Sequence, residues 1–292
     1  MSKKRLIEEE IASIREESTL DMIKYFESNL HQEQGESFNA KRREDVLYYL
    51  EFLDIPYETQ KYKTGENIIA TIGKDPFVGI GSHYDAVEGS PGANDNASAM
   101  AVTLDILKRA QASPLENIGI KAFFFDEEEE GLVGSAAYVK SSDLSELIGV
   151  YNMEMVGKGN KIALWEVESS QRGLLLDTIE SEARKRKIES YRFTKITNGA
   201  DHMSFNAAGI KDAFTLTTIS DGDLIAAQEY YRILSHNASI PNLYELLLKA
   251  PVFAHYHKPT DTSQHLSEQT LQMVSDVLWN SIKEIDKTYK TK

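Results

Sequence analysis

The stretch FVGIGSHYD, residues 77–85, joins a short apolar run to a group of polar residues. The apolar part, Phe77–Ile80, lies between a proline and a glycine, which is the pattern of a short strand buried on both faces. His83 and Asp85 follow it directly. Because ligands of open α/β sheets bind beyond the carboxyl ends of the strands, these two residues are candidate functional groups.

Strands and helices alternate along the chain around this stretch. A helical spacing of apolar residues begins at Ala97, and a last helix is expected to begin near Ser267. Apolar runs predict further strands at Asn67–Ile72, Ile118–Phe125, Leu147–Met155 and Ala213–Thr218. The alternation predicts an α/β fold, a single domain with a central, mostly parallel mixed sheet covered by helices on both faces.

Two segments stand apart from this alternation. Residues 1–40 are predicted to form an N-terminal helical segment packed on the main domain, residues 41–292, because apolar residues recur on one helical face between Ile7 and Phe26. Residues 221–250 contain two helical patches, one around Leu224 to Leu234 and one around Leu243 to Leu248. We interpret this second segment as a helical insertion packed over the edge of the sheet.

The composition narrows the class of protein. The 292 residues carry a net charge of −14, and an acidic surface repels the phosphate backbone of nucleic acid. No apolar run reaches the roughly 18 residues that a membrane span needs. Glu8–Glu10 lie where the apolar part of a signal peptide would be. We therefore expect a cytoplasmic protein that binds neither nucleic acid nor membrane, and its oligomeric state stays open.

Side chains that bind metals follow several of the predicted strands. They are His83, Asp95, the run Glu127–Glu130, Glu154 and His257. The chain has no cysteine, so a zinc site would use histidine and carboxylate ligands. Taken singly, these residues have ordinary alternatives, because glutamate runs and histidines are common on solvated surfaces. Glu154 is the exception, since a charge within an apolar strand needs a partner or a metal.

Taken together, six segments resemble the co-catalytic zinc aminopeptidases, the clan MH metallopeptidases that also include the animal glutaminyl cyclases. The segments follow the order found in that family and cover roughly residues 67–285. They are GSHYD (81–85), GANDNASA (92–99), EEEGLVGS (128–135), NMEMVG (152–157), DHMSF (201–205) and HKPTDT (257–262). One such segment is a weak signal, whereas six in order make a specific one.

The resemblance implies a ligand set for two zinc ions. Asp95 would bridge the two metals, Glu129 and His257 would complete one site, and His83 and Glu154 would complete the other. Members of the family usually have aspartate where this chain has Glu154. A glutamate offers the same oxygen ligands with one more methylene, so the site can survive the change, although the occupancy or choice of metal there can differ.

Four further residues have roles implied by the same resemblance. Glu128 would be the general base, because the family leaves one residue between its second glutamate and the Gly-Leu pair that begins here at Gly131. Asp85 would orient the metal-binding imidazole before it in the chain. Asp201 and His202 match a polar pair that lies near the substrate in such enzymes.

The implied activity is that of a metallo-aminopeptidase, which hydrolyses the N-terminal amino acid from a peptide with a carboxylate-bridged two-zinc site. One alternative is a glutaminyl-peptide cyclotransferase, which usually works with a single zinc. Another is a hydrolase of a different small amide, such as a dipeptide or an acyl amino acid, and a third is a binding protein that has lost its site. The complete ligand set favours the aminopeptidase.

Overall fold

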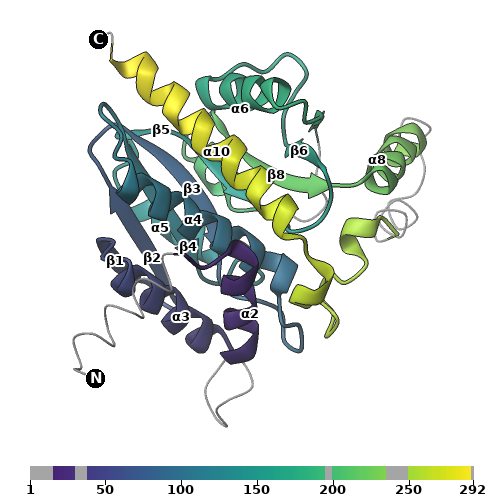
Figure 1. Ribbon diagram of the computed structural model, residues 1–292, viewed down its shortest axis with the longest axis horizontal. Coiled ribbons are helices and arrows are strands. Elements are labelled where there is room, and N and C mark those ends of the chain that lie inside the picture. Colours follow the sequence, from purple (N-terminus) through teal and green to yellow (C-terminus); the bar gives the residue numbers. More distant parts are fainter. Residues whose placement is uncertain (1–15, 30–37, 195–198, 235–248, 291–292) are drawn as a thin grey trace.

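One mixed sheet forms the centre of the molecule (Figure 1). A computed structural model describes residues 16–29, 38–194, 199–234 and 249–290. Its eight strands are ordered β1-β2-β4-β3-β5-β8-β6-β7. Their bounds are β1 Tyr57–Lys61, β2 Glu66–Ile72, β3 Phe77–His83, β4 Gly119–Phe125, β5 Leu147–Met153, β6 Lys161–Trp165, β7 Ser190–Phe193 and β8 Ala213–Ile219.

The four central strands of the sheet are parallel. β3 pairs with β4 and β5, and β5 pairs with β8, in each case in parallel. The antiparallel pairs are β1–β2, β2–β4 and β6–β8, while β7 runs parallel to β6. The predicted mostly parallel mixed sheet is therefore confirmed, and the central strands all end at the same edge. β3 is buried at every position, as its apolar sequence predicted.

Helices cover both faces of the sheet and bury two separate apolar layers. The larger layer is formed with α2 Thr19–Asn29, α3 Phe38–Phe52, α4 Ser98–Ala112, α6 Leu174–Lys185 and α10 Glu268–Tyr289. The smaller layer lies under α5 Val133–Ser141 and α7 His202–Ala207. In Figure 1, α10 runs diagonally across one face, between α4 and α6.

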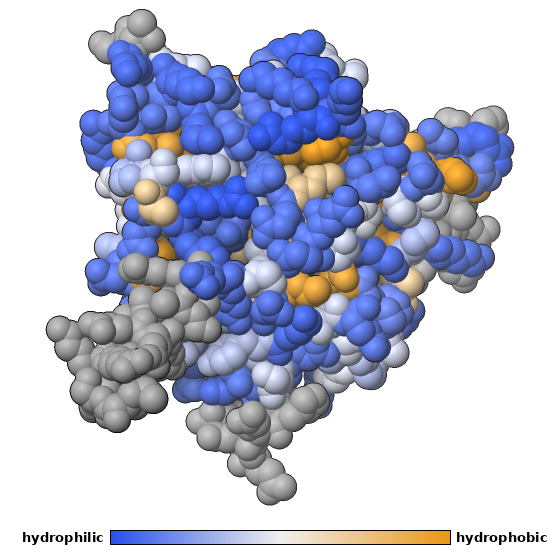
Figure 2. Space-filling view, viewed as in Figure 1, coloured by the Kyte–Doolittle hydropathy of each residue, from blue (hydrophilic) through white to orange (hydrophobic). Residues whose placement is uncertain are grey.

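The outer surface is largely polar. The face shown in Figure 2 is mostly hydrophilic, with only small and separate hydrophobic areas. In the described residues, no helix combines the length and the hydrophobicity needed to cross a membrane.

Several predicted boundaries differ from the structure. β3 continues to His83, three residues beyond the predicted end. β5 ends at Met153, so the prediction that Glu154 lies within the strand was wrong. The backbone leaves the extended conformation at Met155, whose φ is 52°. α10 begins directly after Ser267, whose side chain accepts a hydrogen bond from the Thr270 N–H, as a helix cap does.

The two flanking segments are described only in part. In α2, Met22, Ile23 and Phe26 are buried in the larger apolar layer, whereas Ile7 lies outside the described residues. The helix α8 Asp221–Leu234 matches the first helical patch of the predicted insertion. The second patch, residues 243–248, lies outside the described residues, so the insertion stays a prediction. The proposed boundary between an N-terminal segment and the main domain at residue 40 also stays a prediction.

The C-terminal helix also fixes the turn that precedes β4. The Asp286 carboxylate of α10 accepts backbone hydrogen bonds from Glu116 (3.3 Å), Asn117 (2.7 Å) and Ile118 (3.1 Å). β4 is the strand that leads into the glutamate run. Asp286 therefore anchors the opposite end of the strand that carries the glutamates.

Replacing Asp286 with alanine should lower the free energy of unfolding by about 1–3 kcal/mol, because three backbone N–H groups, including the buried one of Ile118, lose their acceptor. Asp276→Ala is the matched control on the same helix. The Asp276 side chain is 52% exposed and pairs with Arg109, so its loss should cost less than ~1 kcal/mol. Urea unfolding compares the two variants, and equal losses would contradict the anchoring role of Asp286.

Candidate active site

The five predicted metal ligands converge at the carboxyl edge of the sheet. His83 is the last residue of β3, Glu129 follows β4, and Glu154 is the first residue after β5. Because β4, β3 and β5 are neighbours, their ends lie side by side. Asp95 comes from the short helical turn η1 (Ala93–Ala97), and His257 comes from the loop between two short helical turns, η2 Pro251–Phe253 and η3 Ser263–His265.

Asp95 lies at the centre of this group. Its Oδ1 is 3.3 Å from Nε2 of His83, and its Oδ2 is 3.4 Å from Nε2 of His257. Each histidine has a second carboxylate beside it. Oε2 of Glu154 is 3.2 Å from Nε2 of His83, and Oε2 of Glu129 is 3.0 Å from Nε2 of His257. Asp95 is thus shared by two histidine–carboxylate pairs.

These separations fit two zinc ions. Ligand atoms at 2.0–2.1 Å from a tetrahedral zinc lie about 3.3 Å from one another, and the four distances above range from 3.0 to 3.4 Å. The Oδ2 atom of Asp95 is buried and makes no hydrogen bond to the described residues. A buried carboxylate oxygen without a donor needs a cation or a proton. The donor set therefore suits a pair of metals that share Asp95.

Glu128 lies next to this ligand set. Its carboxylate, like those of Asp95 and Glu129, lies close enough to His83 to be grouped with it as a potential metal ligand. However, its Oε2 is 3.9 Å from Nε2 of His83, which is wider than the separation of two ligands on one zinc. The Glu128 side chain also makes no hydrogen bond to the described residues. This separation sets Glu128 apart from the five predicted ligands.

Asp85 organises the glutamate loop as well as a histidine. Its Oδ1 and Oδ2 accept hydrogen bonds from the backbone N–H groups of Glu128 (3.1 Å) and Glu129 (3.0 Å). Nδ1 of His83 is 3.0 Å from the backbone oxygen of Asp85 and 3.3 Å from Oδ1. A proton on Nδ1 satisfies these acceptors and leaves Nε2 unprotonated toward the site, as a zinc ligand requires.

Asp261 holds the backbone of the segment that carries Asp95. Our sequence analysis assigned no role to this residue. Its two carboxylate oxygens accept hydrogen bonds from the backbone N–H groups of Asn94 (3.0 Å) and Asp95 (3.1 Å). Asp261 is buried, and burial raises the pKa of its carboxyl to about 6. The signal for it was present in the segment HKPTDT, but only the fold brings that aspartate behind η1.

Two asparagines and a serine around Asp95 hold the turn that follows β5. Asn94 accepts a hydrogen bond from the Gly157 N–H at 3.0 Å, and Asn96 donates to the Glu154 carboxylate at 2.7 Å. Ser98 accepts from the Val156 N–H at 3.0 Å. The segment that supplies the central carboxylate therefore also positions Glu154.

Burial and crowding shift the pKa of the carboxyl groups in the site. Burial raises the pKa of Glu128 well above its usual value, against the opposing charge of His83, and Glu154 raises it further. Burial likewise raises the pKa of Glu129 and of Glu154. Asp95 differs, because the favourable interactions of its carboxylate with His257 and His83 outweigh burial and lower its pKa. Crowded carboxylates of this kind favour a bound cation.

Burial and charge also compete in setting the pKa of the two histidines, His83 and His257. Burial disfavours their charged forms, but the carboxylates around them outweigh it. The hydrogen bonds of His257 with Asp95 and Glu129 raise its pKa to about 9. The pKa of His83 is also raised, mainly by Glu154 and Glu128 against the effect of burial. Protons thus compete for the places that metals would take, so metal binding should release protons.

Asp201 and His202 lie at the start of α7 and are fully buried. Burial raises the pKa of Asp201 to about 7, and charge interactions link it to His83 and Glu154. Burial lowers the pKa of His202 to about 4, and its Nδ1 is 2.7 Å from Oγ1 of Thr215. The structure therefore places Asp201 near the ligand cluster, and the predicted contact of this pair with the substrate stays a prediction.

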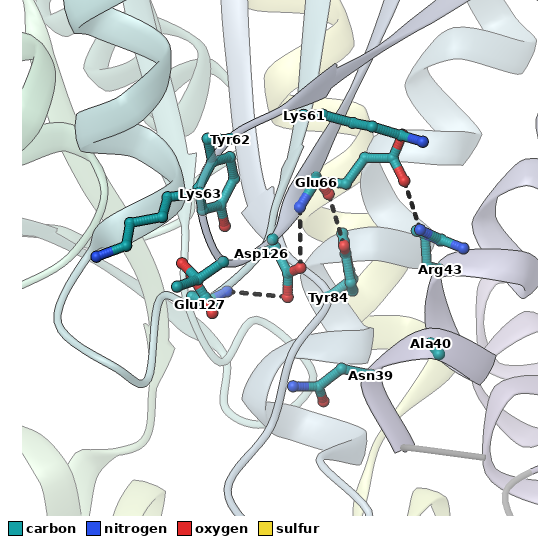
Figure 3. A pocket seen from close by; sticks show the side chains of 12 residues that line it. Asn39, Ala40, Arg43, Lys61, Tyr62, Lys63, Glu66, Tyr84, Asp126 and Glu127 are labelled. Atoms are coloured by element: carbon teal, nitrogen blue, oxygen red, sulfur yellow. Dashed lines mark hydrogen bonds and ion pairs between the residues drawn. The ribbon is translucent and has the colours of Figure 1, made fainter.

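A polar pocket of about 460 Å³ adjoins the glutamate loop (Figure 3). Glu127, which precedes Glu128, lines it together with Asp126, and Thr64 donates a hydrogen bond to Glu127 at 2.5 Å. Asp126 accepts from the backbone N–H groups of Glu66 and Glu127. These bonds tie the glutamate loop to the turn between β1 and β2.

Backbone conformation also marks the site. Glu127, Met155 and His257 have φ values of 54°, 52° and 56°, in the left-handed region that residues with side chains seldom occupy. Each lies within one residue of a predicted ligand or base, or is itself a predicted ligand. Such conformations cost free energy and persist where the surrounding structure fixes them. No sequence pattern predicted them.

The comparison with known families agrees with this geometry. The family model described as Peptidase family M28 matches residues 67–282, which contain the whole ligand cluster. This chain belongs to peptidase family M28. The six segments that suggested the zinc aminopeptidases lie within the matched region.

Known relatives of this M28 chain include aminopeptidases. Aminopeptidase YwaD of Bacillus subtilis is 28% identical over 244 residues, which are 78% of this chain and 46% of the relative. The solved structure of BSAP, a zinc aminopeptidase from Bacillus subtilis, has 25% identity and a TM-score of 0.58, covering 75% of this chain and 50% of that one. The chain thus spans about half the length of these relatives.

A glutaminyl cyclase has a similar fold over nearly its whole length. The Porphyromonas gingivalis enzyme has a TM-score of 0.68 and 17% identity, covering 92% of this chain and 97% of that chain. At that identity the likeness concerns the fold alone.

Asp261→Ala removes the carboxylate that holds the backbone of Asp95. It should weaken zinc binding about 10–100-fold, which is the usual effect of losing a residue that positions a metal ligand. Asp212→Ala is the control, because Asp212 accepts from the N–H groups of Leu175 and Leu176 at the opposite edge of the sheet. It should lower stability and leave zinc affinity at the parental value. Competition with a chromophoric chelator measures both affinities, and a parental value for Asp261→Ala would contradict the role of Asp261.

Proposed function

We propose that the chain is a metallo-aminopeptidase that releases the N-terminal amino acid of peptides with two zinc ions bridged by Asp95. One observation carries the proposal. The two oxygens of Asp95 face two separate histidine–carboxylate pairs, at separations that suit ligands of two tetrahedral zincs. When bound, such a metal pair supplies Lewis acidity to the scissile amide.

Glu128 has the properties of the general base. It is mostly buried, its pKa is raised by that burial, and its side chain makes no hydrogen bond to the described residues. A carboxylate in this state takes a proton from the attacking water and returns it to the leaving amine. Glu129, by contrast, lies 3.0 Å from His257, as a residue held for ligation would.

The charge of the site suits a free N-terminus. Two bound zinc ions would balance the four carboxylates Asp95, Glu128, Glu129 and Glu154, and Asp201 adds a further acidic group beside Glu128. An acidic group in this position attracts a protonated α-amine. This favours peptides with an unblocked N-terminus as substrates.

A cytoplasmic location and the lack of nucleic-acid or membrane partners stay predictions from composition.

Cyclisation of N-terminal glutamine is the second candidate. The match to the glutaminyl cyclase structure covers 97% of that chain, whereas the match to BSAP covers 50% of its chain. The complete set of ligands around Asp95 favours two metals and therefore the aminopeptidase. Turnover of aminoacyl anilides against glutaminyl peptides separates the two: cyclisation without anilide hydrolysis would overturn our proposal.

Adjacent glutamine substitutions should have different effects. Glu128→Gln keeps the shape of the side chain and removes its basicity, so kcat should fall by about 10²–10⁴-fold while two zinc ions stay bound. Glu129→Gln should instead weaken zinc binding, and added zinc should restore part of the activity. Each variant therefore controls for the other, and elemental analysis with anilide kinetics provides both readouts.

The reverse pattern would show that the assignment is displaced by one residue. Loss of metal from Glu128→Gln together with full retention in Glu129→Gln would exchange the two roles. Parental activity in both variants would mean that the run is a solvated acidic face, and the proposed mechanism would lose its base.

A further inference from the structure

The Glu154 carboxylate is held from two sides by asparagine amides. Asn96 Nδ2 donates to Oε2 at 2.7 Å, and Asn152 Nδ2 donates to Oε1 at 3.1 Å. Oε2 is also the atom that lies 3.2 Å from Nε2 of His83. A glutamate side chain has one more rotatable bond than an aspartate side chain, and this freedom has to be limited if Glu154 is to serve as a ligand.

The hydrogen bonds continue from Asn152 into the interior. Asn152 Nδ2 is also 3.1 Å from Oγ1 of Thr215, and that oxygen is 2.7 Å from Nδ1 of His202. Asn152 and His202 are fully buried, and Thr215 is 2% exposed. The four side chains thus form an unbroken chain from the metal site to α7.

The donor and the acceptor of each hydrogen bond in this series can be assigned, starting from Glu154. The carboxylate of Glu154 only accepts, so the amide nitrogen of Asn152, not its oxygen, faces it. The same nitrogen faces Thr215, whose oxygen therefore accepts. The hydroxyl of Thr215 has no other acceptor among the described residues, so its single proton points to His202 Nδ1, which accepts it. In the neutral imidazole the proton lies on Nε2, a buried atom with no partner among the described residues.

We infer that Asn152, Thr215 and His202 form a positioning relay that holds Glu154 in the metal site and fixes His202 with its proton on Nε2. The inference rests on the proposed function, because it treats Glu154 as a zinc ligand. Asn152, Thr215 and His202 are positioning residues, because they act by holding Glu154 and do not themselves bind the metal. At its far end the relay presents a neutral imidazole N–H in the buried interior.

The sheet explains why these residues meet. Asn152 pairs with Thr215 of β8 on one side and with Gly81 of β3 on the other. A Cβ atom on Gly81 would lie 2.5 Å from Asn152 Oδ1, so the glycine makes room for the amide. Strand side chains alternate between faces. His83 and Glu154, each two residues further along, therefore continue the same face, and the relay lies one layer beneath the ligands.

Thr215→Val tests the relay because valine has nearly the same shape and lacks the hydroxyl. We expect one of the two Zn²⁺ ions, the one that Glu154 would bind, to lose about 10–100-fold in affinity, the usual effect of removing a supporting partner. Thr215→Ser restores the hydroxyl and should restore the affinity. Thr217→Val is the matched control, since Thr217 lies on the same face of β8, is 3% exposed and is outside the relay.

Titration of the four proteins with Zn²⁺ alone by calorimetry measures the affinities, and Co²⁺ absorption spectra report the geometry of the site. The ¹⁵N spectrum of histidine-labelled parental protein is a second test that does not depend on metal or activity. It should show the Nε2-protonated form for His202.

The outcomes separate the relay from the proposed function. Parental Zn²⁺ affinity and Co²⁺ spectra in Thr215→Val would overturn the relay, even if the parental protein hydrolyses anilides. An Nδ1-protonated or charged His202 in the parental protein would also overturn it, including in the case that Thr215→Val fails to fold. Failure of the parental protein to bind two zinc ions would contradict the proposed function, while the ¹⁵N spectrum would still decide the direction of the relay.

Discussion

Mutual repulsion of buried carboxylates around Asp95 is the constraint on which the rest of the site depends. Asp95, Glu128, Glu129 and Glu154 lie close together at the end of the sheet. Protons on the histidines relieve part of the repulsion, and bound cations would relieve more. The backbone N–H groups of the ligand segments do not offset this charge directly, because they donate hydrogen bonds to Asp85 and Asp261. Those two aspartates instead fix the segments that carry the ligands.

The parallel centre of the sheet makes this crowding possible. Three adjacent strands, β4, β3 and β5, end at one edge and deliver Glu129, His83 and Glu154 together. Beneath them Gly81, Asn152 and Thr215 lie side by side across neighbouring strands. His83 and Glu154 therefore stand directly above a buried layer of the sheet, whereas Asp95 and His257 come from η1 and a loop. A supporting layer of this kind keeps ligand side chains in position.

The sequence predicted the parts of the fold that have strong periodicity. The central strands and α10 were found because their apolar residues recur regularly. The candidate ligands were assigned from the family resemblance, and the fold brings their side chains together. The segment from Lys161 to Ala207 escaped prediction: β7 is four residues long and mostly half-buried, and α7 has only six residues. Asp261 escaped because its partners, the N–H groups of Asn94 and Asp95, are more than 160 residues away. Left-handed residues such as His257 are set by tertiary packing and leave no local pattern.

The central claim is that Asp95 bridges two metals, and anomalous diffraction at the zinc edge tests it most directly. A crystal of the zinc-loaded chain should show two peaks about 3.5–4 Å apart, one next to each oxygen of Asp95. One peak should be shared with His83 and Glu154, and the other with Glu129 and His257. A single peak enclosed by His83, Glu128 and Glu154, with none beside His257, would contradict the account.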